Sequence, residues 1–109
     1  MIKLGLEIAK EKGIRAHQVV YVAAPGPNLE TKAEYRYMSI IGGDIVGMST
    51  VPEVIVANHM NLPVFAISVI TDEGFHEDLT PVSLQDIVDV AAKAEPKMTL
   101  ILKELIALQ

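Results

Sequence analysis

The residue types that could do chemistry gather mainly in residues 24–50, with further polar residues later in the chain. Glu30 offers a carboxylate, Ser49 a hydroxyl and Asp72 a second carboxylate. A carboxylate can accept hydrogen bonds from the N–H edge of a cyclic amide or a guanidine-like group. A hydroxyl beside a helix N-terminus can hold an anion, and a partly protonated carboxyl group can exchange a proton with a ring nitrogen. We expect these three groups to surround one cavity.

Each of these residues also has a structural interpretation. Glu30 precedes a predicted helix start, where a solvated carboxylate is favourable. Ser49 and Thr50 compete for one helix cap, and capping is the commoner role for either residue. Met48 suits a core position as well as the wall of a flat or sugar ligand. Asp72 could simply cap the loop that it begins, so single residues leave both interpretations open.

The elements that would position these groups alternate between helices and strands. Hydrophobic periodicity predicts helices at residues 1–12, 31–41, 50–61 and 83–106, and strands at residues 19–24, 44–48 and 64–71. The run at residues 19–24 has the pattern of a strand buried on both faces. This order predicts an α/β fold with a parallel or mostly parallel sheet and helices on both of its faces. The strands should end at one rim, which brings residues 25–30, 47–49 and 71–72 together.

Local signals mark where the helices begin and end. Three pairs have the spacing of a capping box: Thr31 with Glu34, Thr50 with Glu53, and Ser83 with Asp86. Pro96 should kink or divide the last helix. Residues 72–81 are polar and contain one glycine and one proline, so we expect a mobile loop there.

Composition narrows the class of protein. The 109 residues suit one domain, and we expect a single α/β unit over residues 1–109. A net charge of −5 without a basic stripe argues against nucleic acid as a partner. The sequence has no cysteine, which excludes disulfides and thiolate metal sites and fits a reducing cytoplasm. Half of the residues are hydrophobic, which suggests an additional buried face.

Several kinds of site and segment are not expected. His17, His59 and His76 lack the spacing of metal ligands, so we predict no metal site. The longest uncharged run, Val54–Thr71, contains asparagine, histidine and proline, which argues against a membrane span. The sequence contains no Gly-x-Gly-x-x-Gly, Walker or Gly-x-Ser-x-Gly motif. This argues against a dinucleotide-binding, NTPase or α/β-hydrolase function.

Two long motifs, Gly26–Glu34 and Gly43–Val54, together with Ile70–Asp72, resemble the purine nucleoside phosphorylase family. The resemblance is to the trimeric branch, which includes the methylthioadenosine phosphorylases. It covers essentially this whole chain but only the C-terminal part of the family's domain. It implies a phosphorylase/hydrolase-like α/β fold, a homotrimer, and reversible phosphorolysis of a purine nucleoside to base and pentose 1-phosphate. Phosphate would be the co-substrate, and no cofactor is implied.

The resemblance also assigns roles to individual residues. Glu30 would hold the N1 edge of the purine. Asp72 would hydrogen-bond the base near N7 and stabilise the leaving purine. Ser49 would bind phosphate. Contacts to the base and the ribose are implied for Leu29, Val46, Met48 and Thr71.

Two questions stay open at this stage. Asp72 is typical of the methylthioadenosine branch, whereas Glu30 and Met48–Ser49 follow the branch that acts on 6-oxopurines. The family's other phosphate ligands lie upstream of the matching part, so we expect the 109-residue chain alone to be inactive or nearly so. The competing hypothesis is a non-catalytic, truncated α/β module that binds a purine or a partner surface without turnover.

Overall fold

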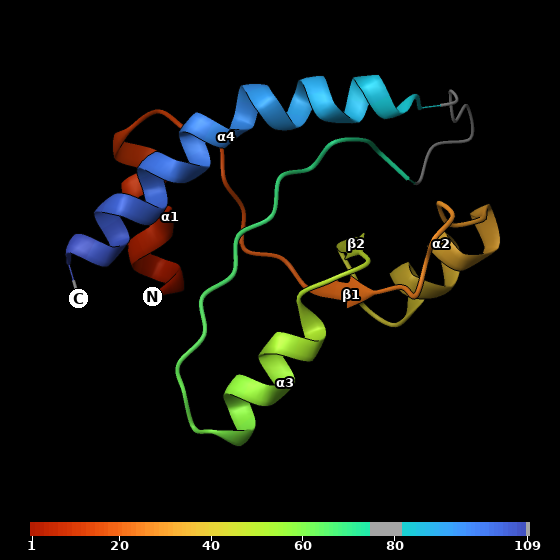
Figure 1. Cartoon of the computed structure of the whole chain (residues 1–109), viewed down its shortest axis with the longest axis horizontal. Coiled ribbons are helices and arrows are strands. Elements are labelled where there is room, and N and C mark those ends of the chain that lie inside the picture. The colour runs from red at the N-terminus through yellow and green to blue at the C-terminus, as the bar shows by residue number, and fades with distance from the viewer. Residues whose placement is uncertain (75–81, 109) are drawn as a thin grey trace. The chain divides into compact units, whose positions relative to one another are not determined.

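The computed structural model describes residues 1–74 and 82–108. In chain order, the elements are α1 (Ile2–Glu11), β1 (Tyr21–Ala23), α2 (Lys32–Ile40), β2 (Ile45–Gly47), α3 (Val51–His59) and α4 (Leu84–Ala107) (Figure 1). The chain divides into two compact units, which are described separately. The first comprises Met1–Gln18, Ile67–Asp72 and Thr80–Gln109, and the second comprises Val19–Ala66 and Glu73–Leu79.

The first unit is built on the contact between α1 and α4. Figure 1 shows α1 beside the C-terminal part of α4. The buried apolar side chains at this contact are Ile8 and Ala9 of α1 and Ile101 and Leu105 of α4. Gly5 of α1 is also buried. Removing these apolar groups from water is the main force that holds the two helices together.

An ion pair lies beside this apolar contact. Lys12 Nζ is 2.5 Å from Glu104 Oε1, and both side chains are about one-third exposed. The hydrogen bond to Glu104 and its negative charge raise the pKa of Lys12 above its ordinary value. Exposed pairs of this kind contribute little to stability, so the apolar side chains are the stronger link between α1 and α4.

The expected start of α4 is confirmed. Ser83 Oγ accepts from the Asp86 N–H at 3.2 Å, and the Asp86 carboxylate accepts from the Ser83 N–H at 3.1 Å. The helix then runs through Pro96 to Ala107, so this proline does not divide it. Figure 1 shows that the axis of α4 changes direction along its length.

The second unit contains a parallel pair of strands, as the sequence predicts. The register of β1 with β2 pairs Tyr21 with Ile45, Val22 with Val46, and Ala23 with Gly47. The Ala24 N–H donates to the Gly47 carbonyl at 2.9 Å, and the Asp44 N–H donates to the Val20 carbonyl at the same distance. These bonds continue the pairing beyond both strand ends and confirm the α/β class with parallel strands.

The helix α2 begins and ends where its sequence signals indicate. The Glu34 N–H donates to Thr31 Oγ1 at 3.3 Å, and the Thr31 N–H donates to the Glu34 carboxylate at 2.7 Å, which confirms this capping box. Gly42, with a φ of +94°, follows the helix and turns the chain back toward β2. Met38 is the buried side chain of α2.

The start of α3 differs from its prediction. Thr50 occupies the N-cap position, but its side chain makes no capping hydrogen bond, so the Thr50–Glu53 capping box is wrong. A capping residue takes an extended backbone that aims its oxygen at the first helical N–H groups. Thr50 has a φ of 74°, which is not extended.

The predicted third strand is not formed. Residues 62–71 have no strand assignment, and among the described residues none pairs with them in a sheet. Their exposure still alternates: Phe65, Ile67, Val69 and Thr71 are half-buried, and the residues between them are exposed. The segment therefore keeps the side-chain alternation of a strand but lacks the neighbour whose backbone would complete the hydrogen bonds.

The expected burial of the first strand on both faces is also wrong. Val20 is 55% exposed, and the described residues give β1 one neighbouring strand, β2. The helix α3 contributes no buried side chain. In the part of the chain that the structure describes, no helix has the length and apolarity needed to cross a membrane.

Candidate functional site

The loops that follow β1 and β2 lie against each other. Gly26, just after β1, has a φ of +62°. A Cβ atom built on Gly26 would lie 2.5 Å from Met48 Sδ, just after β2. Glycine allows both the positive φ and this close approach. The structure thus brings together two of the three strand ends that were expected to converge.

Glu30 lies in the first of these loops, one residue before Thr31, the N-cap of α2. The carboxylate that caps this helix belongs to Glu34, whose Oε2 accepts from both the N–H and the hydroxyl of Thr31 at 2.7 Å. These bonds lower the pKa of Glu34, the N–H of Thr31 having the larger effect. Glu30 is half-buried, and its neighbour Leu29 is 52% exposed. Glu34 is therefore the carboxylate that stabilises the start of α2. This weakens the interpretation that Glu30 serves only to stabilise that helix start.

The strand β2 presents its side chains alternately to two faces. Val46, half-buried, and Met48, 47% exposed, lie on one face. Gly47 points to the other face, where a Cβ atom would collide with the ring of Tyr21. Val46 and Met48 therefore lie on the same face of β2, and their contacts to a base and a ribose stay a prediction.

Ser49 is held through its backbone and its side chain. Its N–H donates to Tyr21 Oη at 3.2 Å. Its carbonyl accepts from the Val51 N–H at 2.8 Å. Its Oγ lies 3.2 Å from Thr50 Oγ1, so the two hydroxyls form a pair.

The start of α3 supplies fewer donors for an anion than a helix end usually does. The Val51 N–H is already used by Ser49, and Pro52 has no N–H. Glu53 adds a negative charge to this first turn. Contacts to an anion here would therefore depend on side-chain hydroxyls more than on backbone N–H groups.

Thr71 and Asp72 belong to the other compact unit and are described by themselves. Both are half-buried. Thr71 Oγ1 donates to Asp72 Oδ1 at 2.7 Å, which fixes the carboxylate relative to its neighbour. Their convergence with the loops after β1 and β2 stays a prediction.

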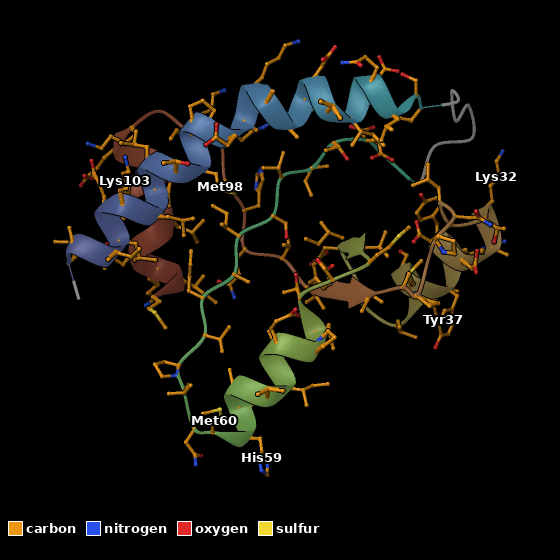
Figure 2. The ribbon with its side chains drawn as sticks, in the orientation of Figure 1. Lys32, Tyr37, His59, Met60, Met98 and Lys103 are labelled. Atoms are coloured by element: carbon orange, nitrogen blue, oxygen red, sulfur yellow. The ribbon has the colours of Figure 1, made fainter. Side chains whose placement is uncertain are left out.

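Two of the three histidines, His17 and His59, lie in the described part of the chain. His17 is exposed, and Figure 2 shows His59 and Met60 at the C-terminal end of α3, both exposed. His76 and most of the predicted loop at 72–81 lie outside the described residues. Within residues 1–74 and 82–108, no cluster of three or more histidines and carboxylates could hold a metal ion.

Sequence reasoning missed two residues that shape this site. Tyr21 was considered only as part of an apolar strand, although its hydroxyl accepts from Ser49. The available signal was its polar group, since a buried tyrosine hydroxyl usually finds a partner. Gly26 was considered only as part of a motif in the loop after the first strand, and its contact with Met48 required the register of the two strands.

Comparison with known proteins identifies the family. Residues 1–107 match the model of the phosphorylase superfamily. The chain belongs to this superfamily. It is 39% identical over 104 residues to purine nucleoside phosphorylase 1 of Bacillus subtilis (strain 168), covering 95% of this chain and 38% of that protein. The chain thus spans well under half the length of this relative, and the resemblance to purine nucleoside phosphorylases is confirmed.

Solved structures give the same result. A purine nucleoside phosphorylase from Schistosoma in complex with hypoxanthine superposes with a TM-score of 0.88 and 35% identity, over 96% of this chain and 39% of that chain. The Schistosoma mansoni enzyme in complex with inosine gives a TM-score of 0.87 at 35% identity, over 96% of this chain and 38% of that chain.

Proposed function

We propose that the complete protein, meaning this phosphorylase-superfamily chain with any coding sequence continuous with it, is a purine nucleoside phosphorylase. It would convert a purine nucleoside and phosphate reversibly to the free base and ribose or deoxyribose 1-phosphate. The observation that carries this proposal is the contact between Gly26 and Met48. It joins the two motifs of the resemblance in one compact unit, with Glu30 in one loop and Ser49 in the other.

The proposed mechanism assigns each polar group to one part of the reaction. A phosphate oxygen, held by the Ser49 hydroxyl, bonds to C1′ while the C1′–N9 bond breaks and its electron pair moves to the purine. A proton donated toward N7, from Asp72 in its acid form or from a water that Asp72 binds, stabilises the negative charge that develops on the purine. Glu30 accepts from the N1–H and fixes the orientation of the base. Thr71 orients Asp72 through the bond between their side chains.

Apolar side chains complete the proposed pocket. Val46 and Met48 form a wall beside the base and the ribose, and Leu29 covers the base from the loop after β1. An aliphatic side chain at position 29 packs on a purine but cannot stack as an aromatic ring does. Schistosoma relatives solved with inosine, guanosine and adenosine support a purine nucleoside as the substrate.

Phosphate-dependent release of hypoxanthine from inosine tests this proposal. We expect turnover by the complete protein that requires phosphate and produces equal amounts of base and pentose 1-phosphate. Methylthioadenosine is the matched substrate, since Asp72 is typical of enzymes that use it. Base release from inosine or methylthioadenosine that does not depend on phosphate, or no release from either, would contradict a phosphorylase function.

The 109-residue chain by itself is a second sample for the same assay. Ser49 is the one phosphate ligand that the resemblance places in this chain, and a single hydroxyl holds a phosphate dianion weakly. We therefore expect little or no turnover by the isolated chain. Robust turnover would show that the remaining phosphate ligands are not needed.

A non-catalytic interaction module is the second candidate function. The observation that favours it is the exposure of large apolar side chains on α3, including Ile55 at 62% and Val56 at 57%. Such surface usually marks an interface. Binding of hypoxanthine by the complete protein without phosphorolysis would favour this function.

The proposal extends to assembly and location. We expect a homotrimer in the cytoplasm that uses phosphate as co-substrate and no cofactor. The family resemblance supports the trimer, and a sequence without cysteine suits a reducing compartment. Light scattering coupled to size-exclusion chromatography of the complete protein measures the mass, and a monomer would contradict the trimer.

A further inference from the structure

Thr50 holds an unusual backbone conformation between Ser49 and α3. Its φ is 74° and its ψ is −47°, and the Val51 N–H donates to the Ser49 carbonyl at 2.8 Å. These values describe a γ-turn centred on Thr50, of the rare type with positive φ. A β-branched residue seldom adopts positive φ, and strained backbone of this kind persists where the surrounding structure holds it in place.

The side chain of Thr50 does not compensate for this strain by capping α3. The caps of α2 and α4, Thr31 and Ser83, both accept a backbone N–H three residues later. Thr50 makes no such bond. Its hydroxyl lies instead 3.2 Å from Ser49 Oγ, because the γ-turn brings two consecutive side chains to the same side.

We propose that Thr50 is a positioning residue for Ser49: its γ-turn places its hydroxyl to donate to Ser49 Oγ, which leaves the Ser49 proton directed to phosphate. This inference rests on the proposed role of Ser49 as a phosphate ligand. The deprotonated oxygens of a phosphate dianion can only accept hydrogen bonds, so Ser49 must donate to hold one of them. A hydroxyl has one proton and two acceptor positions, so Ser49 can donate to phosphate while it accepts from Thr50.

The backbone of Ser49 is fixed by hydrogen bonds, so the direction of its hydroxyl proton is what can still vary. Tyr21 fixes the Ser49 N–H, and Val51 fixes the Ser49 carbonyl. If the Ser49 hydroxyl donated to Thr50 for part of the time, its proton would point away from phosphate during that time. A chain of hydrogen bonds from Thr50 through Ser49 to phosphate also strengthens each bond in it.

Thr50→Val and Thr50→Ser distinguish the effect of the Thr50 hydroxyl from the effect of the side chain's shape. Valine keeps the β-branch and removes the hydroxyl, whereas serine keeps the hydroxyl. In the complete protein we expect Thr50→Val to raise the KM for phosphate about 5- to 10-fold, as expected for one lost hydrogen bond, with the nucleoside KM changed less than about twofold. Thr50→Ser should restore the phosphate KM. Thr99→Val, which removes a hydroxyl that donates to Glu95 on α4, is the matched control and should change neither constant.

A double-mutant cycle with Ser49→Ala tests whether Thr50 acts through Ser49. We expect Ser49→Ala to raise the phosphate KM more than Thr50→Val does, and Thr50→Val to have no further effect in the Ser49→Ala background. Additive effects would make Thr50 an independent ligand and overturn the inference. An unchanged phosphate KM in Thr50→Val, or failure of Thr50→Ser to restore it, would also overturn it.

Calorimetric titration with inorganic phosphate distinguishes failure of this inference from failure of the proposed function. A parent protein that binds phosphate without nucleoside turnover still tests the role of Thr50, because Thr50→Val should weaken that binding by the same factor. A parent that turns over inosine with a phosphate affinity insensitive to Thr50→Val would keep the function and refute the inference. A parent that binds no phosphate would refute both.

Discussion

The backbone of Gly26 lies directly against the side chain of Met48. A Cβ atom at Gly26 would be 2.5 Å from the Met48 sulfur. The two residues lie in the loops that follow neighbouring parallel strands, and they belong to the two different motifs on which the family resemblance depends. This contact brings two separate stretches of sequence together in one compact unit.

Replacing Gly26 with alanine should displace Met48. The new methyl group would collide with the thioether and would also have to adopt a φ of +62°. In the complete protein we expect the KM for inosine to rise and the melting temperature to fall. Steady-state kinetics and thermal unfolding measure the two effects.

Gly13→Ala is the matched control for this substitution. Gly13 has a nearly identical φ of +64°, but a Cβ atom there meets nothing within 4 Å. Gly13→Ala should therefore lower the free energy of unfolding by about 1 to 2 kcal/mol, the cost of a positive φ for alanine, and leave the kinetics unchanged. Equal effects of Gly13→Ala and Gly26→Ala on the inosine KM would show that the Met48 contact is unimportant.

Removing the Glu30 carboxylate should abolish most activity. A hydrogen bond to a charged group contributes about 1.5 to 3 kcal/mol, so Glu30→Ala should lower kcat/KM for inosine about 10- to 100-fold. Glu7→Ala, an exposed carboxylate of α1, should leave kcat/KM unchanged. Unaltered turnover in Glu30→Ala would mean that this residue does not hold the base.

Two isoleucines of α4, one buried and one exposed, allow the contribution of core packing to stability to be measured. Ile101 is 3% exposed and Ile106 is 71% exposed. Ile101→Ala should lower the free energy of unfolding by about 2 to 5 kcal/mol, because it leaves a cavity where α1 contacts α4. Ile106→Ala should change it by about 0.5 kcal/mol or less. Denaturant unfolding of the complete protein measures both, and similar values would contradict the packing of α1 against α4.

Acid should weaken the start of α2 through Glu34. The N–H and the hydroxyl of Thr31 lower the pKa of this carboxyl group below its ordinary value of 4.5. Because the folded-state pKa is the lower one, Glu34 stabilises the fold above pH 4.5, and this contribution is lost as the pH falls through the folded-state pKa.

Carboxyl-carbon NMR titration measures this effect directly. Thr31→Val should raise the pKa of Glu34 toward its ordinary value, since one of the two bonds is removed. Asp86 is the internal reference, because its pKa is lowered by the hydroxyl and the N–H of Ser83, which Thr31→Val leaves intact. A Glu34 pKa that does not change in Thr31→Val would refute the role of the capping box.

Local signals in the sequence were sufficient for most elements. The capping boxes at Thr31 and Ser83 depend on residues three apart, so their spacing predicted both helix starts. The same spacing failed at Thr50, because the exit from β2 forces a γ-turn there, and no local pattern encodes that backbone. The apolar run at residues 64–71 kept its alternation without forming a strand, since a strand also needs a neighbour.

The sequence by itself determined the α/β class, the parallel strands and the membership of the phosphorylase superfamily, because periodicity and contiguous motifs are local properties of the chain. Only the tertiary structure decided that Gly26 admits Met48, that Tyr21 holds the backbone of Ser49, and that Thr50 turns its hydroxyl to Ser49 rather than to α3. The contacts of Gly26 and Tyr21 join residues distant in sequence, and they depend on strand register and on the space available between side chains. The hydroxyl pair of Ser49 and Thr50 depends on a backbone turn that the strand exit imposes.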